Sequence, residues 1–265
     1  MTLVKRLSLR FVSSLGSVAI DLCDSIGLFL LFIVETVRAA LSRAPNLYRL
    51  LAQVNAVGVS SFSIIFLTGL FTGMVFAVQS YVGFQRVGGE QYIGSVVALG
   101  LIRELGPVLT GLMVTGRAGS AITAELGSMR VTEQIDALVT LRINPLHYLV
   151  VPRIMAGVIT LPCLALFSMA IGIVGGYTVC VHVLGLSPED YVTSVRSFVE
   201  LRDICGGIFK AGVFGLILTT IASYKGMQAH GGARGVGIAT TQSVVLSSVT
   251  ILVVDYLLTQ IMERL

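Results

Sequence analysis

Residues 92–116 read YIGSVVALGLIRELGPVLTGLMVTG, an apolar stretch that holds Arg103 beside Glu104 and continues at once into Gly106 and Pro107. A helix needs about 20 apolar residues to cross about 30 Å of hydrocarbon, so this stretch predicts a membrane-spanning helix. A charge at the centre of such a helix costs roughly 2.5–3.5 kcal/mol on insertion scales. The two charges therefore require partners or a polar cavity.

The composition of the whole chain places it in a membrane. The sequence is 55% hydrophobic and 12% charged, with a mean hydropathy of +0.90. Soluble domains carry about twice that share of charge. The fold class expected is therefore an all-α integral membrane protein, and the net charge of +4 indicates topology and not nucleic-acid binding. Five spans are predicted, at about 54–80, 91–116, 154–181, 204–224 and 236–262.

Residues 1–53 contain only the short apolar run SIGLFLLFIV at 25–34, which Asp21, Asp24 and Glu35 flank. No small-residue cleavage site follows, which disfavours a signal peptide. We predict an amphipathic helix that lies in the cytoplasmic interface with its basic residues against anionic headgroups. A sixth span, tilted or re-entrant, stays open as the alternative.

Basic residues predict the orientation of the five spans. Those of the N-terminal segment and of the loops at 117–153 and 225–234 fall on one side, whereas the other side holds only Arg86, Arg196, Arg202 and Arg264. Because loops rich in lysine and arginine stay in the cytoplasm, the N-terminus is predicted to be cytoplasmic and the C-terminus periplasmic.

Catalytic and metal-binding motifs are missing from the sequence. The histidines and cysteines have no spacing typical of a metal site, and no cofactor is expected in this chain. Because no GxxxxGK[ST] motif is present, the chain is not expected to hydrolyse ATP by the P-loop route. Two GxxxG pairs, Gly69 with Gly73 and Gly172 with Gly176, indicate close helix contacts within one chain or between two copies.

The segment between the second and third predicted spans, 116–153, is rich in charge. Ser120 or Thr132 is a candidate helix cap, and we predict a short helix over about 120–136 with an apolar stripe. Its candidate contact residues for a soluble partner are Glu125, Arg130, Glu133 and Asp136. A solvated loop helix without a partner is an equal alternative.

Residues 101–138, LIRELGPVLTGLMVTGRAGSAITAELGSMRVTEQIDAL, strongly resemble the MlaE/YrbE permease family of ABC-type lipid transporters. The resemblance extends over nearly the whole chain and includes RINPLHYLVVPR at 142–153 and YKGMQAHGGARGVGIATTQSVV at 224–245. It implies a homodimeric permease of the bacterial inner membrane that moves phospholipids between inner and outer membrane and so maintains outer-membrane lipid asymmetry.

The same resemblance implies partners for the chain: a cytoplasmic ABC ATPase that binds ATP and Mg²⁺, a small STAS-domain protein and a hexameric periplasmic MCE protein. The segment 120–136 would then be the coupling helix that docks into the ATPase. Two other functions remain as alternatives. The first is a proton-coupled secondary transporter, because the spans contain the titratable residues Glu104, Lys210 and Asp255. The second is a non-transporting anchor for the periplasmic ring.

Two further sites are predicted from position within the spans. Lys210 and Asp255 lie about six and seven residues from the outer ends of adjacent spans, roughly 10 Å deep at 1.5 Å per residue, so we predict an ion pair. Pro107 cannot donate to the carbonyl of Arg103, so charge, kink and a free carbonyl coincide near mid-membrane.

We therefore predict that this segment borders a lipid cavity in the dimer. Arg103 would be available to a phosphate headgroup, and Glu104 would shape the polar wall. Beside Arg103, Glu104 and Pro107, the predicted cavity residues are Gly69, Gly73 and Phe76 on the neighbouring span. A polar network needed only for folding is the alternative.

Overall fold

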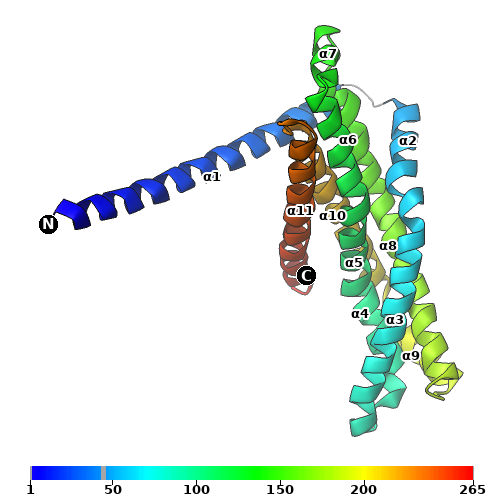
Figure 1. Cartoon of the computed structure of the whole chain (residues 1–265). Coiled ribbons are helices and arrows are strands. Elements are labelled where there is room, and N and C mark those ends of the chain that lie inside the picture. The colour runs from blue at the N-terminus through cyan, green and yellow to red at the C-terminus, as the bar shows by residue number, and fades with distance from the viewer. Residues whose placement is uncertain (1, 43–45, 265) are drawn as a thin grey trace. The chain divides into compact units, whose positions relative to one another are not determined.

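The computed structural model describes residues 2–42 and 46–264, and the chain divides into two compact units, Met1–Ala44 and Pro45–Leu265. Every element within the described residues is helical. The first unit is one long helix, α1 (Thr2–Ser42). The second unit is a helical bundle that begins with α2 (Leu47–Val57) and ends with α11 (Gly232–Met262), as Figure 1 shows.

Six helical stretches of the described residues are long and apolar enough to cross a membrane, which confirms the predicted fold class. Five of them correspond to the predicted spans. The sixth, Cys23–Ser42, covers the region for which the sequence predicted an interfacial helix. It reaches spanning length because the helix does not stop at the end of the run 25–34 but continues through Glu35 and Arg38. Its place in or on a membrane stays a prediction.

The glycine pairs of the first and third predicted spans face each other inside one chain. Helix α3 (Phe62–Phe84) lies beside α8 (Val151–His182) (Figure 1). A side chain added at Gly69 would meet Ser168, and one added at Gly73 would meet the backbone of Gly172. These glycines therefore allow two helices to approach closely, and the helix contact lies within the chain.

The second predicted span is longer than expected. Helices α4 (Ile93–Gly100), α5 (Gly106–Val114) and α6 (Ser120–Val131) follow one another through two π turns, Leu101–Leu105 and Thr115–Gly119. Within α6, Ile122 and Leu126 are buried. The Thr123 hydroxyl is 3.1 Å from the Ala222 carbonyl of α10 and 2.9 Å from Ser243 Oγ of α11. Helix α6 thus belongs to the bundle core.

The predicted separate helix over 120–136 is therefore wrong in its bounds. Ser120 donates to the carbonyls of Gly116 and Arg117 and so continues the helix instead of capping it. The helix is interrupted at Thr132 and Glu133, where Glu133 adopts a left-handed conformation with φ of 60°. A short helix, α7 (Gln134–Thr140), follows. The apolar stripe that suggested a surface helix instead packs into the bundle.

Three helices complete the bundle: α8, α9 (Pro188–Phe198) and α10 (Leu201–Met227). Tyr191 of α9 is buried, packs with Ala77, Val97 and Cys180, and donates its hydroxyl to the carbonyl of Ile173 at 3.3 Å. Burial raises the pKa of this tyrosine above its usual value. Helix α9 thereby covers the end of the bundle at which α10 begins.

Candidate functional site: a mixed-charge cavity

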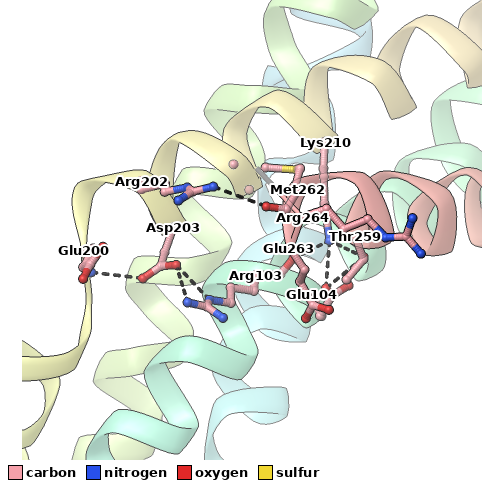
Figure 2. Close-up of a pocket in the computed structure, with 12 residues that line it drawn as sticks. Arg103, Glu104, Glu200, Arg202, Asp203, Lys210, Thr259, Met262, Glu263 and Arg264 are labelled. Atoms are coloured by element: carbon pink, nitrogen blue, oxygen red, sulfur yellow. Dashed lines mark hydrogen bonds and ion pairs between the residues drawn. The ribbon is translucent and has the colours of Figure 1, made fainter.

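A cavity of about 490 Å³ lies where α10 begins and α11 ends, beside the π turn of LIREL. Figure 2 shows that its wall comes from these three segments. Both basic and acidic side chains line it. The lining residues are Arg103, Glu104, Glu200, Arg202, Asp203, Gly206, Gly207, Lys210, Thr259, Met262, Glu263 and Arg264.

The π turn provides the backbone acceptor of this site. Pro107 has no amide hydrogen, so the carbonyl of Arg103 lacks its usual helical donor. The helix widens here, and Gly106 donates to the carbonyl of Leu101 five residues earlier. Lys210 Nζ lies 2.9 Å from the Arg103 carbonyl oxygen and donates to it. The free carbonyl expected from the sequence is thus satisfied by a side chain from another helix.

Lys210 is the centre of the charged cluster. Its side chain is only 4% exposed, and Nζ also donates to Glu104 Oε1 and Thr259 Oγ1, each at 2.8 Å. Asp255 Oδ1 lies 3.4 Å from the same nitrogen. The structure therefore brings Lys210 and Asp255 together and adds Glu104 as a second carboxylate. Buried charges of this kind require partners, because an unpaired ammonium in apolar surroundings is strongly unfavourable.

Arg103 and Asp203 form the second charged contact, drawn to the left of Glu104 in Figure 2. Arg103 Nη2 and Nε lie 2.7 Å and 2.8 Å from Asp203 Oδ1. Asp203 also caps α10, because its Oδ2 accepts from the Glu200 amide at 3.0 Å. The aspartate is 8% exposed and the arginine 53% exposed. One end of the guanidinium thus remains open to the cavity.

The structure changes one expectation about this segment. Arg103 and Glu104 lie level with the first turns of α10 and the last turn of α11, and their depth in a membrane stays a prediction. Glu104 does not act apart from Lys210 and Asp255, because it shares Lys210 with Asp255. Position along the chain could not reveal this, since relative depth depends on where each helix begins.

Four of the predicted cavity residues lie away from this cavity. Gly69 and Gly73 are buried against α8, and Phe76 packs against Gly100. Pro107 is buried beneath the π turn and acts on the cavity only through the Arg103 carbonyl. Arg103 and Glu104 are the predicted cavity residues that line it.

Asp203 and Thr259 are site residues that the sequence analysis missed. Thr259 Oγ1 lies between Lys210 Nζ at 2.8 Å and Glu104 Oε1 at 3.1 Å. Both residues have a signal in the sequence. Asp203 stands three residues after Glu200, the spacing of a capping box, and Thr259 stands four after Asp255, hence on the same helix face.

The predicted partner-contact residues lie at the other end of α10. Glu125 Oε1 of α6 pairs with Arg153 Nη2 of α8 at 2.8 Å, and Arg153 is 4% exposed. Arg130 Nη1 pairs with Asp136 Oδ1 across the α6–α7 break at 2.6 Å. Glu133 is exposed at that break. These residues form one region, which we call the α6–α7 corner (residues 125–140).

The cavity has the chemistry of a binding site for a charged polar group. It offers guanidinium hydrogens and a partly exposed carboxylate, which together can hold a phosphate and an adjacent cation. The π turn that shapes it belongs to a class of helix distortion frequent at functional sites.

Comparison with known proteins identifies the class of membrane protein that the chain is similar to. Residues 50–261 match the family described as Permease MlaE. A probable ABC transporter permease protein of Rickettsia felis is 45% identical over 253 residues, covering 96% of this chain and 98% of that protein. The intermembrane phospholipid transport system permease protein MlaE of Haemophilus influenzae is 39% identical over 260 residues, covering 96% and 97%. TRIGALACTOSYLDIACYLGLYCEROL 1, a chloroplastic protein of Arabidopsis thaliana, is 39% identical over 208 residues, covering 78% and 59%.

Proposed function

Because the chain belongs to the MlaE permease family, we propose that it is the membrane subunit that moves phospholipids between the inner and outer membranes of a bacterium. In this role it maintains the lipid asymmetry of the outer membrane. The observation that carries the proposal is the cavity at which Arg103 presents a half-exposed guanidinium beside a carboxylate. Guanidinium groups bind phosphate oxygens through paired hydrogen bonds.

The proposal includes an assembly around this chain. Two copies form the permease in the inner membrane, with their N-termini in the cytoplasm and their C-termini in the periplasm. The cavity then opens on the periplasmic side, where a hexameric MCE protein receives or delivers lipid. A cytoplasmic ABC ATPase, together with a STAS-domain protein, supplies the energy. The name of the Haemophilus relative, an intermembrane phospholipid transport permease, supports this function.

The α6–α7 corner is the proposed contact with the ATPase. Glu133 and Asp136 are exposed there, Arg130 pairs with Asp136 across the break, and Glu125 lies earlier on α6. Helix α6 continues, through the two π turns, the helical stretch that carries Arg103, so we propose that a displacement of the corner moves the cavity wall. A coupling element attached to the cavity wall in this way links nucleotide hydrolysis to the lipid site.

The test is ATP-dependent transfer of a labelled phospholipid by the assembled complex in proteoliposomes. Arg103→Met is expected to lower the transfer rate by on the order of tenfold, because a charged hydrogen bond to phosphate is worth about 1.5–3 kcal/mol. Arg196→Met is the matched control, since Arg196 is exposed on α9 and does not line the cavity. Transfer that proceeds equally without ATP, or full transfer by the Arg103 variant, would contradict the proposal.

A further inference from the structure

The charged cluster has one cation too few for its carboxylates. Lys210 has three ammonium hydrogens, and its three hydrogen bonds go to the Arg103 carbonyl, Glu104 and Thr259. Asp255 Oδ1 is buried, and within the described residues it accepts no hydrogen bond. Glu104 and Asp255 therefore share a single positive charge, which is unusual for carboxylates held away from water.

Glu104 is the carboxylate of the pair that a ligand can reach. Its side chain is 39% exposed and lines the cavity, whereas Asp255 does not line it. Lys210 and Thr259 both contact Oε1, and no partner from the described part of the chain contacts Oε2. A negatively charged oxygen thus faces the cavity that Arg103 also enters.

The pairing of a free guanidinium end with a free carboxylate oxygen suits a ligand that carries both signs of charge. An anionic headgroup without an amine would satisfy Arg103 and leave Glu104 in repulsion with the phosphate. A headgroup with a primary ammonium satisfies both, because its N–H groups donate to the carboxylate while its phosphate accepts from arginine.

We infer that Glu104 is a specificity-determining residue that binds the primary ammonium of a zwitterionic phospholipid headgroup, so that the cavity prefers amine-bearing lipids to anionic ones. The inference rests on the proposed function and names the lipid class for the same site. The ammonium supplies the cation that the cluster lacks. With the ammonium at Glu104, the positive charge of Lys210, whose Nζ lies 3.4 Å from Asp255 Oδ1, is left to balance the buried aspartate.

Three headgroups separate the contributions of charge and hydrogen bonding. Phosphatidylethanolamine carries phosphate and a primary ammonium, and phosphatidylcholine carries phosphate and a quaternary ammonium without N–H donors. Phosphatidylglycerol carries phosphate and uncharged hydroxyls but no ammonium. The expected order of transfer is ethanolamine, choline, glycerol. One charge-assisted contact predicts a ratio of ethanolamine to glycerol lipid on the order of tenfold.

The experiment measures competitive transfer of these three labelled lipids by the full ATPase-coupled complex in mixed proteoliposomes. Glu104→Gln keeps the side-chain shape and the contact to Lys210 but removes the charge. The ratio of phosphatidylethanolamine to phosphatidylglycerol transfer is therefore expected to fall toward one, because ethanolamine transfer becomes slower. Glu104→Asp keeps the charge and is expected to retain part of the preference. Glu90→Gln is the matched control, since Glu90 lies outside this cavity and its ratio should equal the wild-type ratio.

The outcomes distinguish the inference from the function on which it rests. Equal transfer of all three lipids by the wild-type protein overturns the headgroup preference but leaves phospholipid transport standing. An ethanolamine preference that survives Glu104→Gln overturns the role of Glu104. Absence of ATP-dependent transfer for every lipid overturns the proposed function itself. Should the Glu104 variant be unstable, native mass spectrometry of wild-type protein with the three lipids gives the order of binding, and an order led by phosphatidylglycerol overturns the inference.

Discussion

The two ends of α10 both carry charged contacts, but they differ in how those charges are held. At the cavity, one buried lysine has partners on two other helices and also donates to a backbone carbonyl. At the α6–α7 corner, Arg130 and Asp136 are both exposed and only the Glu125–Arg153 pair reaches into the bundle. The same residue types therefore have different energetic weight at the two ends.

The difference follows from solvent access. An exposed ion pair gains little, about 0–1 kcal/mol, because water and salt screen it. A buried charge that loses its partner costs about 3–5 kcal/mol, because nothing replaces the lost contact. Charges at the cavity thus fix the arrangement of three helices, whereas the exposed charges at the corner remain available to another protein.

Removal of the buried lysine should have the largest effect on stability. Lys210→Met leaves Glu104 and Asp255 together without a cation, so the free energy of unfolding is expected to fall by about 3–5 kcal/mol. Thermal unfolding of the purified protein in detergent measures the change. A triple variant that adds Glu104→Gln and Asp255→Asn should recover most of the loss. A stable single variant would contradict the assignment of this cost to the unpaired carboxylates.

The Glu125–Arg153 pair should respond asymmetrically. Glu125→Ala strands a buried guanidinium and is expected to cost about 1–3 kcal/mol. Arg153→Met leaves a carboxylate that is already 56% exposed and should change stability by no more than about 1 kcal/mol. Unfolding of the two single variants is compared under the same conditions. Equal losses would contradict the assignment of the cost to the buried partner.

Asp203 should have an intermediate effect, because it combines a helix cap with an ion pair. Asp203→Ala removes the acceptor of the Glu200 amide and is expected to cost about 0.5–2 kcal/mol. It also frees Arg103, so phospholipid binding should be retained or strengthened. Unfolding measures the first effect, and lipid binding to the same variant measures the second. A loss of binding at unchanged stability would indicate that Asp203 itself contacts the ligand.

Charge reversal at the α6–α7 corner should have the smallest effect on stability and a clear effect on docking of the ATPase. Glu133→Lys with Asp136→Lys is expected to change the free energy of unfolding by less than about 1 kcal/mol, since both side chains are exposed. Capture of the ATPase and the coupled ATPase rate should both fall. Arg234→Glu, a reversal in the first turn of α11, is the control. Unchanged capture and rate in the double variant would remove the docking assignment.

Much of the fold could be predicted because the membrane simplifies the problem. Every backbone polar group must be satisfied within a spanning segment, so long apolar runs become helices. The predicted spans at 154–181, 204–224 and 236–262 correspond to α8, α10 and α11. At 25–34 the helix continues past the apolar run, and whether it lies on or crosses the membrane stays a prediction. A hydrophobic pattern therefore gives the existence of a helix more safely than its end.

The sequence by itself determined the chemistry available to the site. The missing hydrogen of Pro107 is a covalent property, and so the free carbonyl of Arg103 followed without a structure. The similar depth of Lys210 and Asp255 followed from counting residues within two adjacent helices. The first inference concerns one turn of a single helix, and the second concerns two helices that follow each other in the chain. In both cases the number of residues along a helix gives the distance along its axis.

Only the tertiary structure decided which helices share these groups. Arg103 and Asp203 are one hundred residues apart in sequence, and Glu104 reaches Lys210 and Thr259 on two different helices. The rotation and axial offset of each helix place these side chains together, and both depend on close contacts such as that of Gly73 with Gly172. Such packing is set by the shapes of all the neighbouring side chains at once, which no pattern along a single helix contains.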